Sequence, residues 1–170
     1  ADRLFYEKGI KSVGIDTIIA ESGVAKMSLY HHFPSKENLI IEYLEERDKA
    51  FFKSFELYLD NENIKDPITE YFSFLKKELF KDCSLHCPFL NVIVEFPDMN
   101  NNLHEVIIKH KIKIKTKLQT TLERLGYKNS LKKAEQITLI WHGLLINLQI
   151  FGKEYDIENF FELLKVILKK

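Results

Sequence analysis

The segment VAKMSLYHHFPSKENL, residues 24–39, gathers side chains that could do chemistry. Its two adjacent histidines could transfer protons or bind a metal ion, while its serine, tyrosine and lysines could hold a negatively charged group. Neighbouring residues of a helix point about 100° apart, so His31 and His32 cannot share one proton or one metal ion. The spacing therefore favours a surface that grips another molecule over a catalytic or metal-binding pair.

Two short helices must position this segment. Helical spacing runs from Gly14 to Ser22 and again from Lys26 to His32, and the stretch SGVA joins the two as a sharp turn. This pattern predicts a helix-turn-helix in which Val24 fills the space between the helices. The residues of its small core are Ile15, Ile18, Ile19, Leu29 and Phe33. The second helix then keeps an outer face that carries Lys26, Met27, Ser28, Tyr30, His31 and His32.

An exposed helix face of this composition is suited to the major groove of DNA. Ser28 and Tyr30 can donate hydrogen bonds to phosphates, and the Tyr30 ring can also lie on a thymine methyl group. Lys26 and His31 are the candidate base readers, and Lys36 offers a cation to the DNA backbone. The predicted DNA-binding residues are therefore Lys26, Met27, Ser28, Tyr30, His31, His32 and Lys36.

Helical periodicity continues through the rest of the chain. A further helix begins after the N-cap candidate Ser35 and runs toward Leu59. After a polar break at 60–67, helices are predicted near 67–81, 88–96, 101–126, 131–151 and 156–169. The stretch KHKIKIKTK (109–117) alternates like a strand, but a stripe of apolar residues at helical spacing crosses it, and we predict one long helix there. The predicted fold class is all-α.

The composition excludes several classes of protein. With 170 residues, 45% of them hydrophobic and 29% charged, the chain can bury a core and is not disordered. A formal net charge of zero excludes a uniformly basic nucleic-acid binder but permits a local basic face. No run of about 18 apolar residues is present, so no membrane span is expected. Two cysteines cannot build a disulfide framework, which predicts a reducing, cytoplasmic location.

Charge is unevenly distributed along the chain. Residues 1–44 contain five basic residues against six acidic ones, yet no acid lies between Gly23 and Lys36. Residues 103–133 contain nine basic residues against two acidic ones, which makes them a rival basic surface. For this second stretch, the solvated face of a lysine-rich helix is the simpler interpretation. DNA binding is therefore predicted from the helix-turn-helix pattern and not from the balance of basic and acidic residues.

The N-terminal residues resemble the tetracycline-repressor (TetR) family of bacterial regulators. The resemblance is carried by IIAESG and by Gly23, Val24, Lys26, Ser28, Leu29, Tyr30, His32, Phe33 and Lys36. It implies a three-helix DNA-binding domain at 1–45, whose basic N-terminal arm we expect to be missing here, and a helical ligand-binding and dimerisation domain at 46–170. It further implies a ligand-responsive regulator, usually a repressor. Such a protein binds palindromic double-stranded operator DNA as a homodimer, formed here through the helices near 131–151 and 156–169.

The same resemblance implies a cavity for an unidentified small molecule among the helices from 67 to 151. For each candidate residue, ordinary core packing is the alternative interpretation. His104, His110 and His142 are the possible polar anchors in a largely apolar pocket. The predicted ligand-binding residues are Phe72, Leu75, Phe89, Leu90, Ile93, Phe96, His104, Ile107, Trp141, His142 and Leu145.

Cys83, His86 and Cys87 define an alternative function as a metal- or thiol-sensing regulator, because they are close enough in sequence to share a metal ion. The simpler interpretation is a pair of reduced thiols at a helix start, so no metal and no cofactor is predicted. Sequence patterns of hydrolases, di-metal helix bundles and phosphate-binding loops do not occur. The chain is therefore not expected to be an enzyme.

Overall fold

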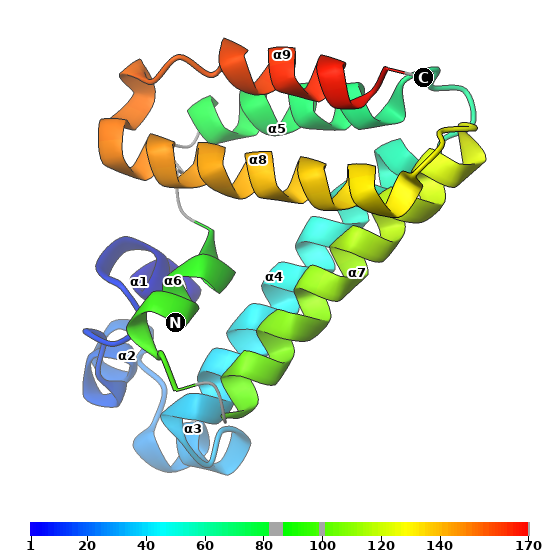
Figure 1. Cartoon of the computed structure of the whole chain (residues 1–170). Helices are drawn as coiled ribbons and strands as arrows, with labels where there is room; N and C mark the ends of the chain where they lie inside the picture. The colour runs from blue at the N-terminus through cyan, green and yellow to red at the C-terminus, as the bar shows by residue number, and fades with distance from the viewer. Residues whose placement is uncertain (82–86, 99–100, 170) are drawn as a thin grey trace. The chain divides into compact units, whose positions relative to one another are not determined.

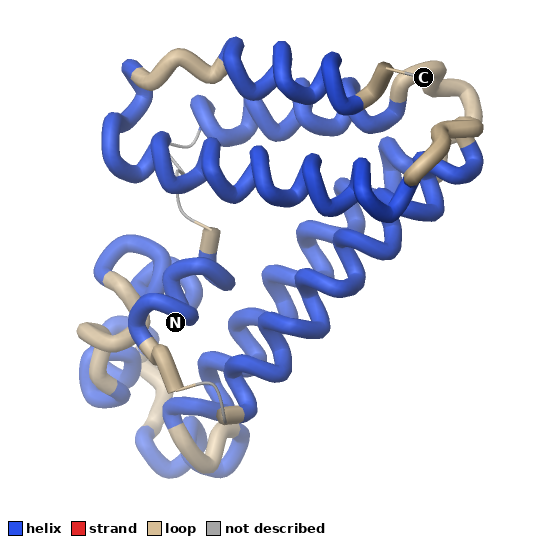
Figure 2. The backbone as a smooth tube through the Cα atoms, viewed as in Figure 1, coloured by secondary structure: helices blue, strands red, loops and turns tan. Residues whose placement is uncertain are grey.

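The computed structural model describes residues 1–81, 87–98 and 101–169, in which every regular element is a helix (Figure 1). The helices are α1 (Asp2–Lys8), α2 (Ile15–Ser22), α3 (Lys26–His32), α4 (Lys36–Leu59), α5 (Pro67–Lys81), α6 (Pro88–Glu95), α7 (Asn102–Arg124), α8 (Ser130–Phe151) and α9 (Glu158–Ile167), with a short 3-10 helix at Gly152–Glu154. Figure 2 shows helix and loop and no strand in these ranges. The predicted all-α fold class is confirmed, and residues 109–117 lie within α7. None of the described helices is long and apolar enough to cross a lipid bilayer.

Ser35 and Pro88 mark the beginnings of α4 and α6, as expected. The Ser35 hydroxyl accepts a hydrogen bond from the Asn38 backbone N–H at 3.2 Å and donates one to Asn38 Oδ1 at 2.7 Å. Pro88 occupies the first turn of α6, where its missing N–H removes no helical hydrogen bond. An N-cap hydrogen bond stabilises a helix by about 1 kcal/mol. The cap therefore helps to hold Lys36, the first residue of α4, in place.

The described helices form two compact units, and α4 and α7 each contribute residues to both. Unit 1 comprises Ala1–Ala50 and His86–Lys109, and unit 2 comprises Phe51–Leu85 and His110–Lys170, each over its described residues. Unit 1 thus combines the N-terminal helices with α6 and the beginning of α7. The functional division at residue 45 stays a prediction, because packing units do not define functional domains.

The core of unit 1 draws one face from each of α1, α2, α4, α6 and α7. Buried apolar residues recur one helical turn apart, such as Ile40 and Leu44 in α4 and Leu103 and Ile107 in α7. The buried set is Leu4, Phe5, Ile10, Val13, Ile18, Leu39, Ile40, Tyr43, Leu44, Phe89, Val92, Leu103 and Ile107. A fully buried side chain of this kind stabilises the fold by about 1.5–3 kcal/mol. Residues from α6 and α7 are therefore part of the core that supports the N-terminal helices.

The loop between α1 and α2 is held by a carboxylate from α6. Glu95 accepts hydrogen bonds from the backbone N–H of Ile10, at 3.2 Å, and from that of Lys11. Gly9 adopts a positive φ of 81°, a conformation that favours glycine and that turns both N–H groups toward the same carboxylate. Lys36 Nζ donates to the Lys11 carbonyl at 3.2 Å. The chain that leads into α2 is therefore fixed by α4 and α6 together.

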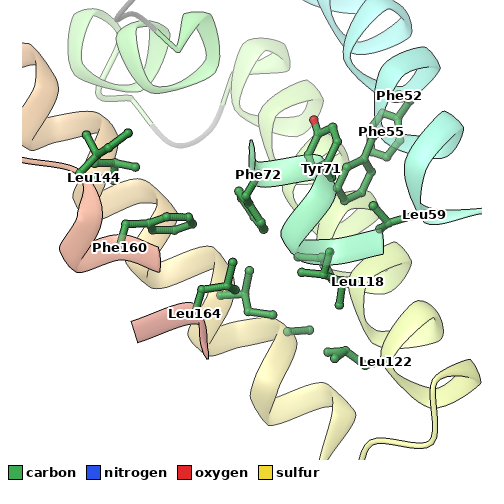
Figure 3. Packing of buried hydrophobic residues seen from close by; sticks show 14 of the residues in the cluster. Phe52, Phe55, Leu59, Tyr71, Phe72, Leu118, Leu122, Leu144, Phe160 and Leu164 are labelled. Carbon is green, nitrogen blue, oxygen red and sulfur yellow. The ribbon is translucent and has the colours of Figure 1, made fainter. Parts of the chain in front are cut away.

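The core of unit 2 is rich in aromatic rings (Figure 3). Phe72 of α5, Trp141 of α8 and Phe160 of α9 form a cluster with ring centroids between 5.1 and 5.7 Å apart. Aromatic pairs at such distances stabilise a fold by about 0.5–1.5 kcal/mol beyond their buried area. The buried set is Phe52, Phe55, Leu59, Ile68, Tyr71, Phe72, Leu118, Leu122, Ala134, Ile137, Leu144, Leu148, Ile157, Phe160 and Leu164.

Candidate nucleic-acid interface

Helices α2 and α3 are joined by a turn at Gly23. Gly23 has a φ of 68°, where a side chain is strained, and its N–H donates to the Ile19 carbonyl at 3.0 Å to end α2. Ile18 and Leu29 are the buried side chains of α2 and α3. One expectation is wrong: Val24 is 40% exposed and does not fill the space between the helices. Val24 belongs to the turn, outside both helices, and its side chain is open to solvent.

The outer face of α3 is formed by the residues that the sequence pattern assigned to it. All six are exposed, namely Lys26, Met27, Ser28, Tyr30, His31 and His32. The two histidine rings lie edge to face, with centroids 5.4 Å apart. Exposure is what a DNA-reading face requires, and the contact of these residues with DNA stays a prediction.

Lys26 has a partner that was not predicted from the sequence. Its Nζ lies 3.1 Å from Asp16 Oδ1, and both side chains are largely exposed. The hydrogen bond and the negative charge of Asp16 raise the pKa of the Lys26 amine. An exposed ion pair of this kind is weak. The local signal for it is an acid in the first turn of α2, ten residues before a lysine that opens α3.

Lys36 is oriented by a backbone carbonyl of unit 1. Its amine donates to the Lys11 carbonyl, and it is partly buried. Burial lowers the pKa of Lys36, and the charge of Glu95 acts in the opposite direction. Glu95 was also not predicted, because it lies 84 residues from Lys11 in the sequence and no local pattern joins them.

The basic stretch 103–133 is engaged largely in contacts within unit 2 and along α7. Lys113 Nζ lies 3.6 Å from the centroid of the Phe52 ring. Lys117 pairs with Asp60, and Lys115 Nζ lies 3.4 Å from Glu135 Oε1. These contacts support the interpretation of a solvated helix face over that of a second nucleic-acid surface.

The predicted ligand-binding residues fall into both units. Those in unit 1 are Phe89, Leu90, Ile93, Phe96, His104 and Ile107. Those in unit 2 are Phe72, Leu75, Trp141, His142 and Leu145. All of them are buried or partly buried, which suits ordinary core packing as well as the wall of a pocket. Their role in ligand binding stays a prediction.

Two of the candidate histidine anchors, His104 and His142, have different surroundings. His104, in the first turn of α7, is buried, and its Nδ1 has no hydrogen-bond partner among the described residues. His142 is partly buried on α8, with its Nε2 2.9 Å from Lys111 Nζ. Burial lowers the pKa of His142 to about 4, and Lys111 and His110 act in the same direction. The neutral His142 ring therefore accepts a hydrogen bond from Lys111.

The alternative sensor site lies mostly outside the described residues. Cys83 and His86 are not among them, and Cys87 is a free, partly buried thiol at the N-cap of α6. Within the described ranges, no group of three or more histidine, cysteine, aspartate and glutamate side chains is placed to hold a metal ion. Metal or thiol sensing stays a prediction.

Comparison with known proteins identifies the N-terminal helices. The model of the tetR family of bacterial regulatory proteins matches residues 1–43. The uncharacterized HTH-type transcriptional regulator YxaF of Bacillus subtilis is 37% identical over 78 residues, which are 45% of this chain and 40% of YxaF. The HTH-type transcriptional regulator LmrA of the same bacterium is 51% identical over 47 residues, 27% of this chain and 25% of LmrA. The matches therefore span less than half the length of either relative.

A solved structure extends the likeness beyond these helices. The TetR-family transcriptional regulator SCO4454 from Streptomyces coelicolor has a TM-score of 0.86 and 25% sequence identity, over 99% of this chain and 89% of that one. The family model and the shared fold agree with each other. Residues 1–43 match the TetR family of bacterial regulatory proteins, and the chain as a whole has the fold of a TetR-family transcriptional regulator.

Proposed function

We propose that this chain is a cytoplasmic, ligand-responsive transcriptional regulator, acting as a repressor, that binds palindromic operator DNA as a homodimer. The observation that carries the proposal is the exposed face of α3, which contains no acidic residue and follows the turn of the matched helix-turn-helix. A second helix of this kind enters the major groove, and flanking residues contact phosphates.

The proposed contacts divide into positioning and reading. Ser28 and Tyr30 donate their hydroxyl groups to phosphates, and Lys36 supplies a cation from the first turn of α4. Lys26, Met27, His31 and His32 face the base edges. Phosphate contacts give affinity that falls with salt, whereas base contacts give specificity.

The homodimer is proposed to form through α8 and α9. One stripe of α8 is exposed and non-polar, at spacings of four, three and four residues: Leu139, Gly143, Ile146 and Ile150. Helix α9 exposes Leu163 and Val166 one turn apart. Such stripes are suited to packing against another helix. A homodimer carries two copies of α3, which suits half-sites about one turn of DNA apart.

Gly143 supports a helical partner for this stripe. A glycine inside a helix costs about 0.5–1 kcal/mol relative to alanine. Outside the adjoining backbone of α8, no described atom lies within 4 Å of a Cβ built at Gly143, so packing inside the protomer does not require a glycine there. Close approach of a second helix supplies a reason for it.

The ligand is proposed to be a largely apolar small molecule with one polar group. His104 is the favoured polar anchor, because its buried Nδ1 lacks a partner among the described residues. Native mass spectrometry of the purified protein tests this proposal, because a co-purifying molecule should weaken operator binding when added back. The exchange His104→Phe should weaken that response.

Fluorescence anisotropy with the DNA upstream of the chain's own gene tests the DNA-binding function. Tyr30→Ala should lower affinity about tenfold or more, since a hydrogen bond to a charged group is worth about 1.5–3 kcal/mol. Lys36→Gln should reduce the salt slope by about 0.9 for each protomer. Lys128→Gln is the matched control, because it removes an exposed lysine of unit 2.

Equal binding of this DNA and unrelated DNA by the unmodified protein contradicts the proposed function. If Tyr30→Ala and Lys36→Gln both behave like Lys128→Gln, the function stands and the assignment of the contacts is wrong.

A further inference from the structure

The face of α3 carries two exposed apolar side chains. Met27 and Tyr30 are spaced three residues apart, which places them on one side of the helix. Their exposed fractions are 86% and 41%, so Met27 extends further into solvent. A single exposed apolar residue needs no explanation, but this one stands at the centre of the face proposed to meet DNA.

The cationic groups near Met27 also have partners within the protein. Guanine is read most often by arginine or lysine at its O6 and N7 atoms. Helix α3 contains no arginine, and its one lysine, Lys26, pairs with Asp16. Lys36 donates to the Lys11 carbonyl. Beside the polar groups of this face, Met27 therefore adds apolar contact as a separate way to read a base.

We infer that Met27, one helical turn from Tyr30, reads the C5 methyl groups of thymines in the operator half-site. The thymine methyl is the apolar group that a base pair presents in the major groove. The long, unbranched side chain of methionine can fit such a group closely. The inference rests on the proposed function, and it adds a class of target, half-sites with thymine under α3.

Substitution of deoxyuridine for thymine tests this inference directly. The exchange removes only the C5 methyl group and leaves every hydrogen-bonding group of the base pair. With the upstream DNA as probe, exchange at one position in both half-sites should lower affinity roughly fifteenfold. This follows from about fourfold for each buried methyl.

The protein variants identify the residue that reads the methyl. Met27→Ala should bind the thymine and deoxyuridine operators with nearly equal affinity at that position, and Met27→Leu should keep most of the distinction. Leu57→Ala is the matched control, because Leu57 is an exposed apolar residue of α4, and it should keep the full ratio. Circular dichroism should show unchanged folding for each variant.

Two outcomes overturn the inference while the proposed function stands. One is sequence-specific binding in which no deoxyuridine exchange changes affinity. The other is a Met27→Ala protein that keeps the full ratio of affinities for the thymine and deoxyuridine operators. Failure to bind the upstream DNA specifically contradicts the proposed function itself, so the two failures are distinguishable.

Discussion

Helices α3 and α8 both expose apolar side chains, and they do so in different patterns. On α3, Met27 and Tyr30 stand among polar residues of a helix of seven residues. On α8, the stripe from Leu139 to Ile150 occupies about half of a helix of 22 residues. At about 1.5 Å per residue, the α3 pair spans roughly 4.5 Å and the α8 stripe roughly 16 Å.

This difference in length suits the different partners that we propose for the two helices. Base pairs follow one another about every 3.4 Å, a spacing close to that of the α3 pair. The α8 stripe has the length of a ridge that packs against another helix, where apolar contact continues over several turns. The length and the setting of an exposed apolar surface therefore say more about its partner than its area does.

The largest expected effect comes from substitutions in the apolar stripe of α8. Leu139→Glu combined with Ile150→Glu places charges on the stripe and should convert the proposed dimer into a monomer. Operator affinity should fall about 100-fold or more, because about 2.7 kcal/mol or more is lost with the second half-site. Analytical ultracentrifugation and anisotropy measure the two effects. Leu57→Glu is the matched control, and a double variant that stays dimeric shows that α8 is not the interface.

A smaller effect is expected from a substitution at Gly143, in the same stripe of α8. In the monomeric background, Gly143→Ala should stabilise the protein by about 1 kcal/mol, because alanine favours the helix. In the dimer, the added methyl should instead weaken association. Chemical denaturation measures the change in stability of the monomer, and dilution measures the change in affinity between the two copies of the dimer. Stabilisation in both backgrounds contradicts close packing at Gly143.

A further prediction concerns the pH dependence that His142 gives to α8. Its pKa in the folded protein, about 4, lies below the ordinary value of 6.5, so the unfolded chain binds the proton first as the pH falls. The free energy of unfolding should therefore decrease from pH 6.5 toward pH 4, and His142→Gln should reduce that decrease. Melting curves of both proteins at about pH 8 and about pH 5, on either side of the unfolded-state pKa, measure it. An unchanged acid response shows that His142 does not contribute.

Local features of this fold were predictable, because they depend on residues close in sequence. The bounds of α3 and the Ser35 cap follow from nearby side chains and backbone groups. The direction of Val24 was not predictable, because it depends on the path of the turn. The contact of Glu95 with Lys11 was not predictable either, because only the folded unit brings them together.

The candidate site was predictable to a similar degree. The exposed residues of α3 follow from helical spacing and a small buried core. The ion pair with Asp16 limits how far Lys26 is available to another molecule. This ion pair depends on the angle between α2 and α3, which the sequence pattern does not give. The residues proposed to bind a ligand come from several helices, and helical spacing alone does not distinguish a pocket wall from a core.

The shared core of unit 1 has a consequence for synthesis of the chain. The N-terminal helices leave the ribosome first, but their core also needs Phe89, Val92, Leu103 and Ile107. At about 5–20 residues per second, the interval between Leu44 and Ile107 is roughly 3–13 seconds. During that interval the N-terminal helices lack part of their apolar partners. The helices proposed to meet DNA are therefore synthesised before their core can be completed, and nascent chains of intermediate length are the ones that need protection from aggregation.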